Sequence, residues 1–178
     1  MIVTRFETER VFYRFLTPRW SHQPLSGAGA AVNGGRFNRP GIEAVYLSTE
    51  PETALAEIRQ GASIAPPATL AAYRVKAEDI ADFSNGFDPA IWAAAWSGWN
   101  ADWKYIARIE RRTPPSLSLA DDLITAGRRG LLFPSTRRAG GINLVLFPAN
   151  LTVADRIAVH DPHGELPVDQ SSWPAPAR

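Results

Sequence analysis

The segment from Gly34 to Glu57 constrains the fold of this chain more than any other. It places Arg36 directly after two glycines, and a short β-branched stretch and a helical pattern follow. Glycine adopts positive φ angles and lets the backbone pass close to other groups, so the arginine after Gly34-Gly35 can project into a cleft. A guanidinium in such a place suits a phosphate, which it contacts through parallel N–H groups. The segment therefore predicts an anion-binding loop.

A strand and a helix are expected after this loop. Residues 45–48 begin with a β-branched residue and lie between glycine and proline, which is typical of a strand. Thr49 and Glu52 have the spacing of a capping box, which predicts a helix over residues 50–60. Ala54, Leu55 and Ile58 then form the apolar face, and Glu57 lies about 60° to one side of Ala54, at the border of the core. Glu52 is explained as a first-turn carboxylate that the helix dipole favours, whereas Glu57 is a candidate functional group.

The remaining pattern indicates a single α+β domain, and the length of 178 residues suits one domain. The predicted strands cover residues 11–15, 45–48, 70–75, 131–133, 142–147 and 156–159. The predicted helices cover residues 50–60, 89–105 and 119–129, and the last has Ser118 as its cap and Gly130 just past its end. We expect the domain to span residues 1–160. The proline-rich residues 161–178, with Trp173, are expected to form an irregular tail.

Four tryptophans occur at helical spacing within the predicted helix 89–105. Trp92, Trp96, Trp99 and Trp103 follow one another at i, i+4, i+7 and i+11. Such a stripe packs a helix onto a sheet, or it forms an exposed anchor for a partner protein. We favour the core interpretation, although Gly98 within the segment weakens the helix prediction itself.

Composition and spacing argue against several functions. The formal net charge of +1 argues against broad, charge-driven binding of DNA or RNA. The chain has no cysteine, so disulfides and thiolate metal sites are excluded. His160 and His163 flank an Asp-Pro turn signal and His22 is distant, so we assign no metal site. The residues around Ser135 lack a nucleophile elbow, which argues against a Ser-His-Asp hydrolase.

The N-terminal residues carry charges throughout, and no segment approaches the roughly 20 apolar residues of a membrane span. We therefore expect a cytoplasmic protein that makes no contact with membranes.

Several motifs together resemble the RES domain, a family named for an Arg, a Glu and a Ser that forms the toxin half of type II toxin–antitoxin pairs. The matching segments, in chain order, are Phe12-Tyr13-Arg14-Phe15, Gly34-Gly35-Arg36-Phe37-Asn38, Val45-Tyr46-Leu47-Ser48, Thr53-Ala54-Leu55-Ala56-Glu57, Leu131-Leu132-Phe133-Pro134-Ser135 and Gly141 to Pro148. The resemblance runs from about Tyr13 to Phe147. The family usually has Trp where this chain has Phe37, which removes an indole N–H and keeps the aromatic surface.

This resemblance implies a fold similar to ADP-ribosyltransferases, with a split mixed sheet around an NAD⁺ cleft and flanking helices. It implies that Glu57 stabilises an oxocarbenium-like ribose while Arg36 and Arg14 hold the pyrophosphate. Tyr46 would stack on or hydrogen-bond the nicotinamide riboside, and Ser135 would orient a ribose hydroxyl or the nicotinamide amide. The full implied set is catalytic Glu57, Tyr46 and Arg36, and NAD⁺-binding Arg14, Arg36, Tyr46, Ser135, Asn38 and Asn143.

Each of these residues also has a purely structural interpretation. Arg14 is consistent with an ordinary sheet arginine, and Tyr46 with a core residue whose hydroxyl is satisfied locally. Ser135 after a proline is typical of a turn, and Asn38 can shape the loop. Asn143 is equally ambiguous.

The resemblance also implies partners and acceptors. The partner is an antitoxin with an Xre-like helix-turn-helix. ADP-ribose passes to water, to phosphate or to a protein, including an enzyme that makes phosphoribosyl pyrophosphate, and the sequence does not separate these acceptors. Two alternatives stay open: a non-catalytic module that binds a nucleotide or a partner, and an RNA-cleaving toxin.

Overall fold

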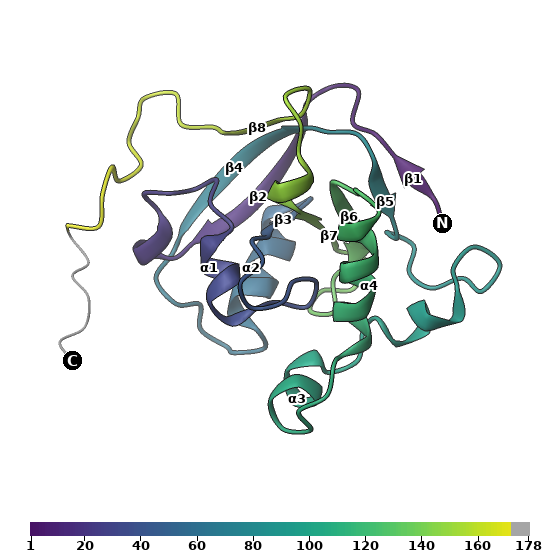
Figure 1. Ribbon diagram of the computed structural model, residues 1–178. Coiled ribbons are helices and arrows are strands. Elements are labelled where there is room, and N and C mark those ends of the chain that lie inside the picture. The colour runs from purple at the N-terminus through teal and green to yellow at the C-terminus, as the bar shows by residue number, and fades with distance from the viewer. Residues whose placement is uncertain (172–178) are drawn as a thin grey trace.

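The computed structural model describes residues 1–171 and shows one mixed β-sheet with helices around it (Figure 1). The strands lie in the order β1-β5-β6-β7-β3-β2-β4-β8. Within the described residues, β5 and β6 pair in parallel and every other neighbouring pair is antiparallel. The prediction of a single α+β domain is therefore confirmed. The strands are β1 Val3–Thr4, β2 Arg10–Leu16, β3 Val45–Ser48, β4 Thr69–Lys76, β5 Ile80–Asp82, β6 Gly130–Pro134, β7 Ile142–Leu146 and β8 Arg156–Val159.

Four α-helices lie against this sheet or extend from it. They are α1 Ala28–Asn33, α2 Pro51–Arg59, α3 Trp103–Arg108 and α4 Pro115–Thr125. Short 3₁₀ helices occur at Pro18–Trp20, Ala94–Gly98 and Pro148–Asn150. In Figure 1, α1 and α2 lie beside β2 and β3, while α3 projects away from the sheet below α4. None of the helices in residues 1–171 has the length and apolarity that crossing a bilayer requires.

The central strands β6 and β7 are apolar at consecutive positions because both faces of the sheet are covered. Leu131 and Val145 lie in a core with α4 and the tryptophan-rich segment. Leu132 and Leu144 face a second core that contains aromatic residues of β2 and β4. Burial on both faces explains why these strands lack the alternation of a half-exposed sheet.

The strand register places the polar residues of the motifs side by side. Ser48 of β3 pairs with Asn143 of β7 and, on its other side, with Tyr13 of β2. The chain turns from the end of β3 directly into α2, which packs on β2 and β3. Glu57 is thereby placed over the sheet near Asn143.

The predicted helix over residues 89–105 is wrong. Trp92 and Trp96 lie in a loop and a 3₁₀ helix, because Ala93 is extended and the following turns close through i→i+3 hydrogen bonds. The ring centroids of Trp92, Trp96 and Trp99 lie 4.8, 4.9 and 5.4 Å from that of Phe83. The core interpretation holds for these three residues, while the fourth, Trp103, begins α3 and is half-buried.

The predicted helix starts also differ. Thr49 caps no helix: its hydroxyl donates to the carbonyl of Ile142 at 3.1 Å, and α2 begins at Pro51 without a side-chain cap. Proline at a first helical position needs no hydrogen-bond acceptor, which explains this start and that of α4 at Pro115. The α4 helix therefore begins four residues before the predicted Leu119.

The end of α4 is earlier than predicted as well, and Gly127 with φ of +73° follows it. Gly130 belongs to β6. A Cβ there would lie 2.4 Å from the carbonyl oxygen of Val145. The sequence patterns also missed α1, β1 and β5, which are short.

Residues 161–171 contain turns and no helix or strand. Asp161 accepts hydrogen bonds from the backbone N–H groups of Glu165 and Leu166, and Leu166 packs against the second core. Residues 172–178, with Trp173, lie outside the described residues. The boundary at residue 160 stays a prediction.

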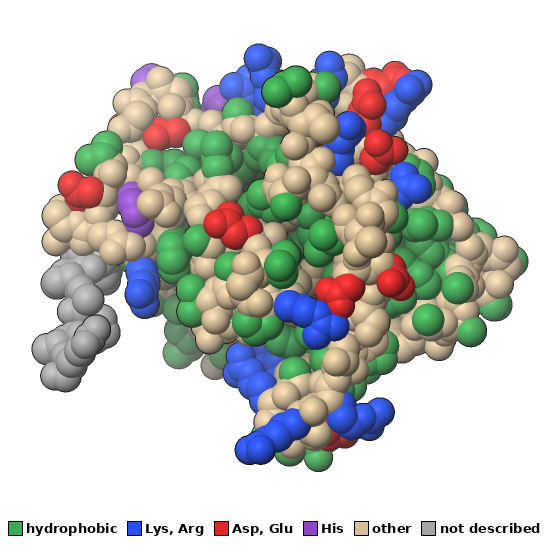
Figure 2. Space-filling model, viewed as in Figure 1, with side chains coloured by type: hydrophobic (Ala, Val, Ile, Leu, Met, Phe, Trp, Pro, Cys, Tyr) green, Lys and Arg blue, Asp and Glu red, His purple; other side chains and the backbone are tan. Residues whose placement is uncertain are grey.

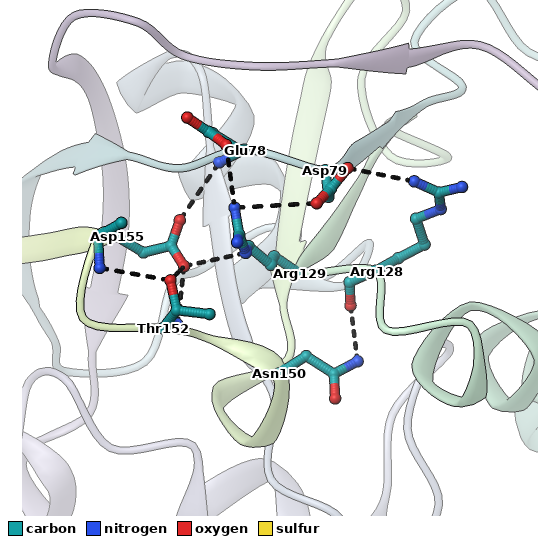
Figure 3. A network of polar contacts seen from close by, with 8 residues as sticks. Glu78, Asp79, Arg128, Arg129, Asn150, Thr152 and Asp155 are labelled. Atoms are coloured by element: carbon teal, nitrogen blue, oxygen red, sulfur yellow. Dashed lines mark hydrogen bonds and ion pairs between the residues drawn. The ribbon is translucent and has the colours of Figure 1, made fainter.

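A buried ion pair fastens the loop before β8 to the start of β6 (Figure 3). The carboxylate of Asp155 lies 3.0 Å from Nε of Arg129, and their side chains are only 2% and 13% exposed. The same carboxylate accepts hydrogen bonds from the backbone and hydroxyl of Thr152 at 2.8 and 3.0 Å. This pair joins the start of β6 to the start of the end strand β8, and these two strands lie on either side of β3 in strand order.

We expect Asp155→Ala to lower the free energy of unfolding by about 3 kcal/mol, because it removes the carboxylate closest to a buried guanidinium and leaves that guanidinium only the longer contacts with Glu78 and Asp79, at 3.7 and 4.0 Å. Glu7→Ala is the matched control. It breaks an ion pair with Arg5 whose side chains are 68% and 66% exposed, so we expect a loss of about 0–1 kcal/mol. Urea unfolding of both variants measures the difference, and equal losses would contradict the role given to Asp155.

Candidate active site

A cavity of about 490 Å³ opens between β2, β3, α2, α3 and the loop that joins β6 to β7. Five of the predicted site residues line it: Arg14, Arg36, Tyr46, Glu57 and Asn143. These residues come from four elements and one loop, so the fold brings together side chains that are far apart in the sequence. Ser135 and Asn38 are not among the residues that line the cavity. Ser135 is hydrogen-bonded to Glu57, and Asn38 is hydrogen-bonded to Tyr46.

One oxygen of Glu57 is fixed by two side-chain donors. Oε1 accepts hydrogen bonds of 2.7 Å from Oγ of Ser135 and of 2.7 Å from Nδ2 of Asn143. The hydroxyl of Ser48 donates to Oδ1 of Asn143 at 2.7 Å, which sets the orientation of that amide. No hydrogen bond within residues 1–171 is formed by Oε2, so this half-buried carboxylate keeps one oxygen for a ligand.

The hydroxyl of Ser135 is fully used inside the protein. It donates to Glu57 and accepts from the backbone N–H groups of Arg137 and Arg138 at 3.0 and 3.1 Å. A hydroxyl has one donor and two acceptor lone pairs, so its capacity is filled. This geometry supports a turn residue that positions Glu57. The contact of Ser135 with a ligand stays a prediction.

The arginine loop has the shape that its glycines predict. Gly34 has φ of +71°, a conformation that favours glycine. A Cβ on Gly35 would lie 2.6 Å from both the Tyr46 hydroxyl and Oδ1 of Asn38. Gly34 therefore supplies the unusual backbone angle and Gly35 the close approach.

Tyr46 and Asn38 hold this loop in place. The Tyr46 hydroxyl donates to Oδ1 of Asn38 at 2.8 Å and accepts from the backbone N–H of Phe37 at 2.9 Å. Nδ2 of the buried Asn38 donates to the carbonyls of Ala30 and Ile42. Burial raises the pKa of Tyr46, so the hydroxyl stays protonated and keeps donating. The geometry supports the loop-shaping interpretation of Asn38, whose contact with a ligand stays a prediction.

Arg36 is anchored through one nitrogen, and its other nitrogens form no hydrogen bond within residues 1–171. Nη1 donates to the carbonyls of Trp99 and Ala101 at 2.9 and 3.0 Å. Burial lowers the pKa of Arg36, and the nearby Glu57 carboxylate opposes that shift. The guanidinium stays charged because its ordinary pKa is far above neutrality.

Arg14 lies on another wall of the cavity. Its Nη1 donates a long hydrogen bond of 3.4 Å to the carbonyl of Ser26. Burial lowers the pKa of Arg14, and the same cause raises the pKa of the neighbouring Tyr73 to about 12. The Tyr73 hydroxyl donates to the carbonyl of Pro24 at 2.9 Å, so it remains neutral beside the cation.

Three further cations line the cavity that sequence reasoning missed: Lys104, Arg108 and Arg137. Lys104 and Arg108 are one turn apart on α3, and Arg137 follows Ser135 by two residues. The i, i+4 spacing was the available signal, but Lys104 stood at the end of the wrongly predicted helix 89–105 and Arg108 lay beyond it. Within residues 1–171, none of the five cations that line the cavity forms an ion pair, and Glu57 is the one carboxylate among the lining residues.

This arrangement has two chemical capacities. Unpaired guanidinium groups bind phosphate oxygens by charge-assisted hydrogen bonds. A carboxylate with a fixed orientation stabilises positive charge that develops beside it without reorganising. The described residues contain no cluster of three or more His, Asp or Glu side chains that could hold a metal ion.

The chain is similar to a known protein family and, in its fold, to a solved structure. The sequence model of the RES domain family matches residues 11–169. No curated protein matches the chain. A chain in the crystal structure of the M. tuberculosis MbcT–MbcA toxin–antitoxin complex superimposes with a TM-score of 0.53 at 20% identity, over 89% of this chain and 87% of that one. At that identity the likeness concerns the fold.

We expect Tyr46→Phe to cost about 1–3 kcal/mol of unfolding free energy, because it leaves Phe37 N–H and Asn38 without their partner. The affinity for inorganic pyrophosphate should fall as well, since the loosened loop carries Arg36. Tyr105→Phe is the control, because Tyr105 is 52% exposed and should tolerate the change. Urea unfolding and calorimetric titration measure the two effects. Unchanged values for Tyr46→Phe would refute the role of its hydroxyl.

Proposed function

The chain belongs to the RES domain family, and from this premise we propose that it is an NAD⁺-consuming toxin of a toxin–antitoxin pair. The observation that carries the proposal is the Glu57 carboxylate, fixed through Oε1 at a cavity where Arg36 and Arg14 form no ion pair with any carboxylate of residues 1–171. A dinucleotide carries one group that suits the cations of this site and one that suits its carboxylate. Its pyrophosphate matches the cations, and its nicotinamide ribose develops positive charge as the glycosidic bond breaks.

The proposed reaction begins when the bond between C1′ of the ribose and the nicotinamide nitrogen breaks. The bonding electron pair leaves with nicotinamide, which becomes neutral, and the ribose becomes an oxocarbenium-like cation. Glu57 stabilises that cation through Oε2. An acceptor oxygen or nitrogen then bonds to C1′, and its proton passes to solvent.

The cations have a positioning role in this proposal. Arg36 and Arg14 hold the pyrophosphate, so that C1′ stays next to Glu57 and a bimolecular step becomes effectively unimolecular. Arg36 suits this role because Nη1 is already bound to two carbonyls and the guanidinium is aimed before the ligand arrives. Asn143 and Ser135 act through Glu57, whose orientation they fix.

The ring of Tyr46 lines the same cavity. Since its hydroxyl is used by the loop, contact with the nicotinamide riboside would use the aromatic face.

The acceptor is a protein side chain in a mono-ADP-ribosyltransferase, and it is water or phosphate in a glycohydrolase or phosphorylase. Both outcomes use the same bond cleavage. For the partner, a structure of similar fold comes from a toxin–antitoxin complex. We therefore propose an antitoxin as the partner of this chain, and the family resemblance implies that this antitoxin has an Xre-like helix-turn-helix.

The test is NAD⁺ consumption by the purified protein, with and without phosphate and cell lysate. We expect Glu57→Gln to reduce the rate by a factor on the order of 10²–10³, since it removes the charge that stabilises the ribosyl cation and keeps the size of the side chain. Glu52→Gln, at an exposed first-turn position of α2, should leave the rate unchanged.

The outcomes separate the remaining functions. Labelled protein bands from the lysate would identify a transferase, and ADP-ribose or its phosphate would identify the other two reactions. A non-catalytic module would bind NAD⁺ without turnover, and Glu57→Gln would be as toxic on overexpression as the original chain. An RNA-cleaving toxin would deplete cellular RNA at constant NAD⁺. NAD⁺ binding without turnover, or RNA loss at constant NAD⁺, would refute the proposal.

A further inference from the structure

The cavity holds more positive charge than a pyrophosphate requires. Each phosphate of a pyrophosphate carries one negative charge in a dinucleotide, and Arg14 and Arg36 match these two charges. Lys104, Arg108 and Arg137 remain on the lining, on α3 and on the loop after β6. In Figure 2, Lys and Arg side chains gather at the lower edge of the molecule, where Figure 1 places α3.

Within residues 1–171, these three cations form no ion pair, although neighbouring cations do. Arg138 pairs with Glu50 and Arg112 pairs with Glu110, whereas the exposed Arg137 lines the cavity and has no carboxylate partner in that part of the chain. The backbone N–H of Arg137 donates to Ser135 at 3.0 Å, so the start of this side chain is held close to Glu57. The loop after β6 and helix α3 therefore place unpaired positive charge at the lining of the cavity.

Lys104 is held in position, although none of the ion pairs within residues 1–171 includes it. Nζ donates to Oε1 of Gln60 and lies 5.8 Å from the ring centroid of Trp103. Burial lowers the pKa of Lys104, and the nearby Arg108 and Arg137 lower it further. Cations crowded in this way repel one another, and a bound anion relieves the repulsion.

We propose that Lys104, Arg108 and Arg137 form a second oxyanion subsite, which takes a phosphate dianion in addition to the pyrophosphate at Arg14 and Arg36. The inference rests on the proposed function, because it assigns the other two arginines to a dinucleotide. The dianion has two available sources: the 2′-phosphate of NADP⁺, or free inorganic phosphate beside bound NAD⁺. Arginine and lysine in a partly buried cavity suit a dianion because each contact is a charge-assisted hydrogen bond.

The experiment measures binding in the Glu57→Gln background, which slows turnover and keeps all five cations. NAD⁺, NADP⁺ and inorganic phosphate are titrated calorimetrically in low-chloride buffer, and phosphate is also titrated after saturation with NAD⁺. If the dinucleotide supplies the phosphate, NADP⁺ should bind about tenfold or more tightly than NAD⁺. If free phosphate is the source, phosphate should bind saturably to the NAD⁺-loaded protein.

The double change Lys104→Ala with Arg137→Ala should abolish whichever gain is found, and Arg108→Ala should reduce it. Arg59→Ala is the matched control, since Arg59 is exposed on α2, does not line the cavity and forms no ion pair within residues 1–171. Circular dichroism of each variant verifies the fold.

The inference is overturned if NADP⁺ and NAD⁺ bind equally and phosphate does not bind, or if the gain survives the double change. This failure differs from that of the proposed function, which would appear as intact NAD⁺ with the unaltered chain.

Discussion

Two hydrogen bonds of 2.7 Å hold Oε1 of Glu57 between Ser135 and Asn143, and the rest of the site is arranged around them. They join α2 to β7 and to the loop after β6, segments that approach one another only in the finished sheet. The pairing of β3 with β7 brings Ser48 opposite Asn143, and their side chains are hydrogen-bonded. The antiparallel register of two central strands thus determines the direction of one carboxylate. A one-residue slip in that register would turn Asn143 to the other face of the sheet.

The burial of cations around Glu57 opposes folding, and the rest of the fold must offset this effect. Burying Arg14 and Arg36 lowers the pKa of each, which means that the protein interior opposes their charge. Backbone carbonyls, and not carboxylates, receive them: Ser26 for Arg14, and Trp99 and Ala101 for Arg36. A carbonyl orients the guanidinium without cancelling its charge. The site therefore keeps its attraction for anions, and the covered strands of the two cores supply the stability that this requires.

Local patterns predicted the parts of the fold that depend on neighbouring residues. The paired glycines predicted the arginine loop, and the β-branched stretch at Val45 predicted β3, because backbone freedom and side-chain shape act within a few residues. The tryptophan spacing failed as a helix signal since the three buried rings gather around Phe83 from a loop and a 3₁₀ helix. Tertiary packing determined that segment, and no periodicity in the sequence reports it.

In the candidate site as well, residues that belong to local patterns were predictable and residues that depend on tertiary packing were not. Glu57 was recognisable as a carboxylate at the edge of an apolar helix face, and the family motifs included Ser135 and Asn143, although as ligand-binding residues and not as partners of Glu57. Lys104 and Arg137 were not recognisable, because they reach the cavity from segments whose mutual position depends on the whole sheet. Residues that meet only through long-range contacts leave no local pattern to read.

The hydrogen bonds from Arg36 to Trp99 and Ala101 make the aromatic core a part of the site. The ring of Trp99 packs against Phe83 while its carbonyl receives the guanidinium, so any shift of the rings redirects the cation. Neither aromatic residue lines the cavity. A screen for inactive variants would therefore find substitutions at positions around Phe83 and Trp99 as well as at Glu57. The set of positions at which mutation silences the protein is then larger than the set that touches its ligand.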